Sequence, residues 1–330
     1  MGYTWGMRNS QGRSAALSIL LIVILSNCRS AESEGVIVHA VERAQAAIVQ
    51  NVPKQNDAPV IERPCSDPST EEICLTEEAV EALNPIDPPE IRCGEAEGRI
   101  EQRDYPGFLS GESIPVIVYL PPCYDPYLQV YPVLFLLHGK PQGEFHWLQL
   151  GVDEIVDKGI LEGVWAPFVI VMPQQPEPLF TQTDGGRGSL EQEIMQGLIP
   201  FILDRYAITG EGERWAIAGI SRGGVWALEI GFQHPDYFQT IAALSPALNV
   251  NEARSIYDPM HMLADAKAVP TRIFLGAGDV DSARTKTQEL AVIINDLGVK
   301  NHYSEVQGNH ESATWTAIIP EMLSFITRNW

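Results

Sequence analysis

From Gly98 to the last residue, short apolar runs alternate with stretches of helical spacing. Turn-forming residues bound each run, as expected of strands that are buried on both faces. The runs are Ile114–Leu120, Val133–His138, Phe168–Met172, Trp215–Ile220, Thr240–Leu244 and Thr271–Gly276, and a last strand is predicted at about Tyr303–Val306. The predicted helices are Val152–Glu162, Leu190–Arg205, Gly223–His234, Thr285–Leu297 and Thr314–Asn329. This alternation predicts one α/β domain over residues 98–330, with a mostly parallel sheet covered by helices on both faces.

Residues 1–28 have the pattern of an export signal. Two arginines precede an uncharged apolar run from about Ala15 to Leu25, which is short for a membrane span. The run ends in Leu25-Ser26-Asn27-Cys28, which resembles a bacterial lipobox, although Asn27 stands where Gly, Ala or Ser is usual. We expect export, with a lipid on Cys28 as the only link to a membrane. The alternatives are an ordinary cleaved signal or an uncleaved anchor, with Cys28 incidental.

Residues 29–97 form an acidic, proline-rich arm. Positions 31–100 carry 15 acidic and 5 basic side chains, which is about half of the net charge of -21. A chain this acidic repels polyphosphates, so we expect no nucleic-acid partner. Frequent prolines oppose regular structure, so we interpret the arm as a spacer, with an acidic partner-binding module as the alternative.

The cysteines are consistent with an exported protein. If Cys28 carries the lipid, four remain: Cys65, Cys74, Cys93 and Cys123. Paired thiols persist as disulfides in oxidising compartments, and closeness along the chain favours Cys65–Cys74 and Cys93–Cys123 among the three possible pairings. No Cys-x-x-Cys motif occurs and no His stands at ligand spacing beside these residues, so we expect no metal site.

The strongest chemical signal is Gly219-Ile220-Ser221-Arg222-Gly223, between a predicted strand and a predicted helix. This is the context of a nucleophile elbow, in which glycines permit a tight turn that exposes the serine hydroxyl. The helix N-terminus beside Ser221 favours a developing negative charge. A Gly-x-Ser-x-Gly motif alone is common by chance, so the prediction rests on its position.

A serine nucleophile needs a base and an orienting acid. His310 follows the last predicted strand and is our candidate base, since a neutral imidazole can accept the proton of Ser221. Asp279, the first acid beyond the strand 271–276, is our candidate for orienting the imidazole, and Asp281 is its rival. The order Ser, Asp, His along the chain is that of α/β-hydrolases.

The loop after the strand 133–138 is our candidate for an oxyanion hole. We expect the backbone N–H groups of Lys140 and Arg222 to face the oxyanion, since Pro141 has no N–H group. His146 and Trp147 follow in this loop and are candidates for the substrate pocket. Packing in the core is at least as good an explanation for Trp147.

Several stretches, in order, resemble the putative-esterase family of α/β-hydrolases, which includes esterase D, feruloyl esterases, enterochelin esterases and mycolyltransferases. They are Val118–Pro122, Tyr131–Gly139, Pro167–Pro173, Leu198–Ile202, Ala216–Gly224 and Gly308–His310. The resemblance implies an eight-stranded α/β-hydrolase sheet, a triad of Ser221, Asp279 and His310, and no cofactor. It favours Asp279 because family members place their acid in a Gly-x-x-Asp setting. Cys123 and Arg222 depart from the family's usual Gly and Met.

These patterns predict an exported serine esterase that forms an acyl-enzyme on Ser221. Its partner would be a small-molecule or polysaccharide-borne ester, and the sequence does not indicate an oligomeric state. Two alternatives stay open. An acyltransferase would pass the same acyl group to an alcohol, and a carbohydrate-binding or scaffold protein would keep a vestigial site.

Overall fold

A computed structural model of the chain describes residues 93–210, 212–263, 270 and 272–330. The signal, Cys28, Cys65, Cys74 and nearly all of the arm lie outside these residues. The predictions made for them, and the boundary expected between residues 97 and 98, therefore stay predictions. No helix in the described part of the chain is long and apolar enough to cross a bilayer.

Eight strands form one sheet in the order β1-β2-β4-β3-β5-β6-β7-β8. The strands are β1 (Arg99–Pro106), β2 (Ser113–Leu120), β3 (Val133–Leu137), β4 (Val169–Pro173), β5 (Gly212–Ile220), β6 (Phe238–Leu244), β7 (Arg272–Gly278) and β8 (Lys300–Val306). The pairs β1–β2 and β2–β4 are antiparallel, and the other pairs are parallel. The expected mostly parallel sheet is thereby confirmed.

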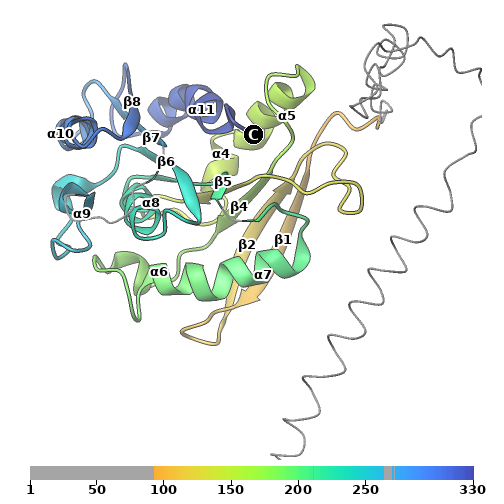
Figure 1. The fold of residues 1–330 in the computed structure, drawn as a ribbon, viewed down its shortest axis with the longest axis horizontal. Helices are drawn as coiled ribbons and strands as arrows, with labels where there is room; N and C mark the ends of the chain where they lie inside the picture. Colours follow the sequence, from red (N-terminus) through yellow and green to blue (C-terminus); the bar gives the residue numbers. More distant parts are fainter. Residues whose placement is uncertain (1–92, 211, 264–269, 271) are drawn as a thin grey trace, which may run out of the picture. The chain divides into compact units, whose positions relative to one another are not determined.

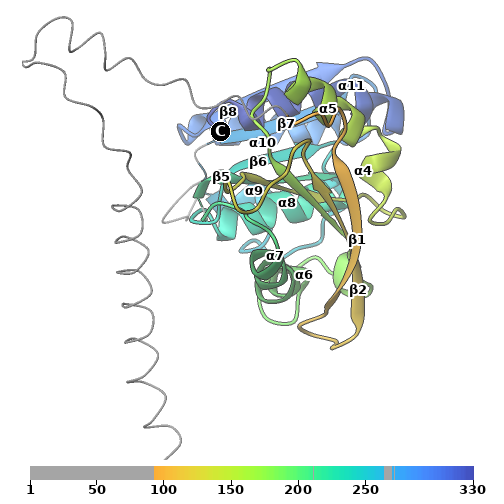
Figure 2. The same ribbon diagram turned by 90° about the vertical axis from the view of Figure 1, so that its right-hand side faces the viewer.

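Helices cover both faces of the sheet (Figures 1 and 2). They are α4 (His146–Gln149), α5 (Val152–Leu161), α6 (Leu190–Glu193), a π-helical turn η2 (Ile194–Leu198), α7 (Ile199–Arg205), α8 (Arg222–Gln233), α9 (Pro259–Met262), α10 (Arg284–Asp296) and α11 (Ser312–Thr327), with 3-10 turns η1 (Leu179–Thr181) and η3 (Leu248–Val250). Helices α4, α5 and α11 pack on one face, and α7, α8 and α10 pack on the other.

The central strands supply both cores by simple alternation. In β3, Val133, Phe135 and Leu137 join the core under α7 and α8, while Leu134 and Leu136 join the core under α4, α5 and α11. Side chains of a strand point to opposite faces in turn, so a strand buried on both sides must be apolar throughout. These central strands could therefore be predicted from their continuous apolar runs.

The edge strand β1 has no such run in its sequence. Of its eight residues, Tyr105 alone is buried, because β1 pairs only with β2 at the edge of the sheet. Its sequence, Arg99 to Pro106, is mostly polar. The pattern of apolar residues therefore predicted six strands and missed this one, while the other edge strand, β8, is also mostly polar and was predicted only in part, as residues 303–306.

The parallel strands all end at one edge of the sheet. Leu137 of β3 is paired with Gly219 of β5, and Ile220 at the end of β5 is paired with Leu244 of β6. Leu244 is paired in turn with Gly276 of β7. Loops that follow β3, β5, β6 and β7 therefore begin side by side, and the candidate chemistry lies in these loops.

Candidate active site

Ser221 occupies a sharp turn between β5 and α8. Its backbone has φ 55° and ψ -116°, a region that non-glycine residues rarely adopt. A Cβ on Gly219 would lie 2.1 Å from the carbonyl oxygen of Gly223, and one on Gly223 would lie 2.3 Å from that of His138. Close backbone contacts therefore leave no room for a side chain at either glycine of the motif. A nucleophile elbow is expected to have this property.

Three side chains are joined by hydrogen bonds at this turn. His310 Nε2 lies 2.9 Å from Ser221 Oγ, and His310 Nδ1 lies 3.0 Å from Asp281 Oδ1 and 3.2 Å from Asp281 Oδ2. A carboxylate can only accept, so Nδ1 carries the proton of a neutral imidazole and Nε2 is free to accept the proton of Ser221. The arrangement is that of a nucleophile, a base and an orienting acid.

The acid in contact with His310 is Asp281, the rival candidate, and not Asp279. β7 runs through Gly278, two residues beyond its expected end, and Asp279 still donates its N–H to Val306 of β8 at 2.8 Å. The exposed carboxylate of Asp279 accepts the N–H of Gly308 at 3.0 Å instead. A turn after Gly278 then directs Asp281 inward, where its side chain is buried.

Asp281 is held in its ionised form. Burial by itself would raise the pKa of this carboxyl group, but hydrogen bonds from His310, Ser245 and the backbone N–H of Ala283 outweigh burial and lower it. The N–H of Ala283 donates to Oδ1 at 2.7 Å. The negative charge that orients the imidazole is therefore present at neutral pH.

The loop after β3 lies against the elbow, as expected. A Cβ on Gly139 would come within 3.4 Å of Ser221 Cβ. His138 fixes this turn, since its Nε2 accepts the N–H of Gln175 at 3.0 Å. Burial lowers the pKa of His138 to about 4, so the ring is neutral at neutral pH. The assignment of the N–H groups of Lys140 and Arg222 to an oxyanion hole stays a prediction that this arrangement favours.

His146 and Trp147, the candidates for a substrate pocket, are instead buried, with 3% and 0% of their surface exposed. Trp147 Nε1 donates to the carbonyl oxygen of Leu137 at 3.1 Å, so this indole is part of the core. His146 Nδ1 accepts the N–H of Gly139 at 3.3 Å, and burial lowers its pKa to about 4. His146 thus stabilises the candidate oxyanion loop from its buried side, through the backbone of Gly139.

Arg222 attaches two surface loops to the elbow. Its Nε donates to the carbonyl oxygen of Phe180 at 3.2 Å, Nη1 donates to Asn251 Oδ1 at 3.1 Å, and Nη2 donates to the carbonyl oxygen of Gln182. Trp226, one turn further along α8, also donates to the Phe180 oxygen, at 3.1 Å. The guanidinium group that replaces the family's usual Met is therefore occupied in holding the loop between β4 and α6.

Two buried acids lie under the same loop. Glu191 accepts from His234 Nε2 at 2.7 Å and from the N–H of Gly186. Glu229 is fully buried, and its two oxygens make no hydrogen bond of normal geometry with the described residues, although the backbone N–H of Gly185 lies near enough to oppose the rise of its pKa. Burial raises the pKa of Glu229 to about 9, helped by the charge of Glu191. Glu229 is therefore protonated at neutral pH.

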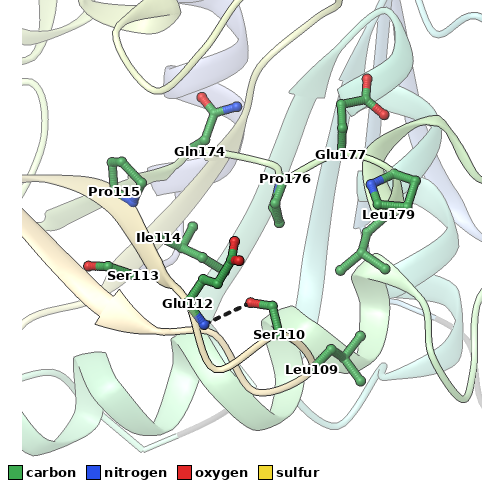
Figure 3. A pocket seen from close by; sticks show the side chains of 11 residues that line it. Leu109, Ser110, Glu112, Ser113, Ile114, Pro115, Gln174, Pro176, Glu177 and Leu179 are labelled. Carbon is green, nitrogen blue, oxygen red and sulfur yellow. Dashed lines mark hydrogen bonds between the residues drawn. The ribbon is translucent and has the colours of Figure 1, made fainter.

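A pocket of about 440 Å³ opens beside the loop that follows β4 (Figure 3). Its apolar lining includes Ile114 and Leu179, and Glu112 and Glu177 are its acids. Glu177 Oε1 lies 3.4 Å from Lys140 Nζ, so the pocket borders the candidate oxyanion loop.

The tip of the β1–β2 hairpin forms one wall of this pocket and is fixed by a single buried acid. Glu193 accepts the N–H groups of Phe108 and Leu109 at 2.8 and 2.9 Å. A buried carboxylate needs such donors, and here the backbone of the hairpin supplies them.

The structure contains the disulfide Cys93–Cys123 that was expected from closeness along the chain. Cys93, Glu95 and Cys123 are also the one group of three potential metal ligands among the described residues. Because the two sulfurs are bonded to each other, neither is available as a thiolate. Glu95 instead accepts the N–H of Cys123 at 2.9 Å.

The fold and the site together define an α/β-hydrolase with a serine in the nucleophile elbow. The chain belongs to the putative-esterase family, whose model matches residues 109–326. The resemblance inferred from the sequence motifs is thus confirmed.

Two curated relatives illustrate this membership. An endo-1,4-beta-xylanase/feruloyl esterase of Xylanibacter ruminicola is 28% identical over 236 residues, covering 68% of this chain and 31% of the relative. A ferri-bacillibactin esterase of Bacillus subtilis is 27% identical over 165 residues, covering 47% of this chain and 56% of the relative. The chain therefore spans less than two thirds of either relative.

Solved structures share the fold. A ferulic acid esterase superposes with a TM-score of 0.63 at 22% identity, over 70% of this chain and 98% of that one. An S-formylglutathione hydrolase from Staphylococcus aureus superposes with a TM-score of 0.61 at 16% identity, over 70% and 99% of the two chains. The α/β-hydrolase fold expected from the sequence is confirmed by these neighbours.

Proposed function

We propose that the protein is a serine esterase that hydrolyses a carboxylic ester through an acyl-enzyme. The observation that carries the proposal is the continuous hydrogen-bonded chain from Asp281 through His310 to Ser221, with 3.0 and 2.9 Å between successive partners. Family membership and relatives named as esterases support it.

The proposed reaction has two halves. Ser221 Oγ attacks the ester carbonyl while His310 Nε2 takes its proton, and the N–H groups of Lys140 and Arg222 stabilise the oxyanion. His310 then gives the proton to the leaving alcohol. A water that His310 deprotonates attacks the acyl-enzyme, and the acid is released as Ser221 regains its proton.

The replacement Ser221→Ala tests this proposal. We expect turnover of a short p-nitrophenyl ester to fall by at least about a thousandfold, while the circular dichroism spectrum and melting temperature stay close to those of the native protein. A fluorophosphonate probe should label the native protein and spare the variant. Retained turnover in the variant would refute the proposal, and absence of both turnover and labelling in the native protein would favour a vestigial site.

We propose an aromatic ester, borne by a small molecule or a polysaccharide, as the substrate class. The names of the relatives support this choice, since two of the proteins described above are feruloyl or ferulic acid esterases. The partly apolar pocket of about 440 Å³ beside the oxyanion loop also supports it. Methyl ferulate should therefore be hydrolysed faster than aliphatic methyl esters. Product analysis with added sugar acceptors distinguishes hydrolysis from acyl transfer.

We further propose that the protein is exported and tethered to a membrane by a lipid on Cys28. The signal pattern of residues 1–28 supports this, and so does the disulfide Cys93–Cys123, since disulfides persist outside the cytosol. Replacement Cys28→Ala should release the mature protein from the membrane fraction of a bacterial host. A variant that stays in that fraction would contradict the lipid tether.

A further inference from the structure

Ser245, at the carboxyl end of β6, has a backbone conformation that calls for an explanation. It follows Leu244 with φ 46°, in the left-handed region that a non-glycine residue rarely occupies. Its side chain is fully buried, and its N–H donates to the carbonyl oxygen of Gly276 at 2.7 Å. Strained conformations of this kind persist where the surrounding structure fixes them, and often near functional sites.

The hydroxyl group of Ser245 lies between an indole and the acid of the site. Trp315 Nε1 donates to Ser245 Oγ at 3.0 Å. A buried hydroxyl that accepts one bond still has a proton to donate, and the carboxylate of Asp281, whose pKa Ser245 helps to lower, is the acceptor beside it. Asp281 receives hydrogen bonds from the N–H of Ala283 at 2.7 Å and from His310 at 3.0 Å, and the hydroxyl of Ser245 is placed to add a third.

Trp315 links this hydrogen-bond chain to the rest of the site. It lies in the first turn of α11, five residues after His310, and 8% of its surface is exposed. Its ring meets that of His310 edge-on at 5.2 Å between centroids and that of His146 at 5.7 Å. The indole thus packs against the base and against the side chain that supports the oxyanion loop.

We propose that Ser245 and Trp315 are positioning residues, which hold Asp281 in the orientation that aligns His310 with Ser221. The proposal rests on the proposed function, because it assigns a role in that same site. Neither residue needs to touch the substrate. Trp315 fixes the hydroxyl of Ser245, and that hydroxyl fixes the carboxylate oxygens, leaving Asp281 one orientation in which to accept from His310.

The test is a pair of substitutions at Ser245 in the full chain, with a short p-nitrophenyl ester as substrate. For Ser245→Ala we expect kcat to fall roughly tenfold, as for the loss of one buried hydrogen bond, with KM unchanged. Ser245→Gly removes the same hydroxyl but tolerates the left-handed backbone, so it should lose as much activity. A glycine variant with native kcat would show that only the backbone matters, and it would overturn the proposal.

The pH profile provides a readout that simple loosening of the fold would not change. Without the hydroxyl, more negative charge remains on Asp281 to stabilise the imidazolium form of His310. The acidic limb of kcat/KM should therefore move to higher pH in both Ser245 variants. Trp315→Phe keeps a ring but removes the donor, and we expect a smaller fall in kcat, roughly threefold, with the same direction of shift.

Ser304→Ala is the matched control, because Ser304 also donates to a carboxylate, that of Glu321, but between β8 and α11. It should leave kcat and the pH profile unchanged. Native kcat and an unmoved acidic limb in Ser245→Ala would overturn the proposal while leaving the esterase assignment intact. Retained turnover in Ser221→Ala would instead overturn the esterase assignment itself.

Discussion

The two sides of Ser221 are built on different principles. On the side of β6, β7 and α11, which we term the acid side, Ser245, Asp281, His310 and Trp315 stand within a few residues of strand ends or in the first turn of a helix. On the other side, the segment 174–189, which we term the β4–α6 loop, is held by hydrogen bonds to side chains of α8 and α6.

This difference suggests where the molecule can vary. The acid side is fixed by strand pairing and by buried hydrogen bonds, so its geometry follows from the sheet. The β4–α6 loop depends on a few polar side chains, with Arg222 bound to two of its carbonyl oxygens. Loops supported in this way can change shape without disturbing the chemistry, as is usual where a rigid scaffold carries variable binding loops.

The acid side should be the more sensitive of the two, and Asp281→Asn should have the largest effect. An amide in place of this carboxylate favours the wrong tautomer of His310, so we expect kcat to fall by about a thousandfold or more. Asp279→Asn is the matched control, since it changes an exposed acid two residues away, and it should cost less than about threefold. The opposite result in steady-state kinetics would restore Asp279 as the triad acid.

Glycine substitutions compare the elbow with the β4–α6 loop in terms of folding. Gly219→Ala places a methyl group 2.1 Å from a backbone oxygen, so we expect destabilisation by more than about 3 kcal/mol. Gly188, in the β4–α6 loop, has φ 81° but open space around its Cβ position. Gly188→Ala should cost only about 1 kcal/mol, through backbone strain. Chemical denaturation measures both changes, and equal losses would remove the distinction between elbow and loop.

The smallest expected effect is a gain in stability beneath the β4–α6 loop. The pKa of Glu229 is raised from 4.5 to about 9 on folding, so the folded protein keeps a proton that the unfolded chain releases. Stability therefore falls as the pH rises between these values. Glu229→Gln cannot ionise, so its melting temperature should exceed that of the native protein by several degrees at pH 8 and by little near pH 4.5.

Glu112→Gln, which alters an acid in the exposed hairpin tip, is the control for this measurement and should show no such pH-dependent gain. If Glu229→Gln were no more stable than the native protein at pH 8, the buried acid would not be a source of instability in the loop.

The same contrast explains which parts of the fold and of the site could be predicted from the sequence. Ser221 follows an apolar strand, and six of the strands were visible as apolar runs, whereas the strand before His310 is mostly polar. Asp279 was preferred over Asp281 because it is the first acid after the predicted strand end at Gly276. The strand in fact continues to Gly278, and the turn that follows directs Asp281 inward instead. The sequence could not decide whether Trp147 lines a pocket or packs in the core. Nothing in a sequence indicates that its indole donates to the backbone carbonyl oxygen of Leu137.

Ser245 and Trp315 were not singled out from the sequence, although one signal was available. Ser245 directly follows a predicted strand, as Ser221 does, and could have been examined as a third polar group at that edge. The buried acids Glu191, Glu193 and Glu229 gave no signal, because their burial depends on loops whose course the pattern of apolar residues does not specify.

The hairpin fixed by Glu193 has a consequence for altering this protein by design. Its tip is closed by its own backbone, with Gly107 N–H bonded to the oxygen of Glu112 at 2.7 Å and Gly111 N–H bonded to that of Gly107 at 2.8 Å. Only two backbone N–H groups tie it to Glu193, and a backbone donor is present in any residue except proline. Replacement tips of varied sequence and length can therefore be grafted between β1 and β2, which would make one wall of the pocket an exchangeable part of the enzyme.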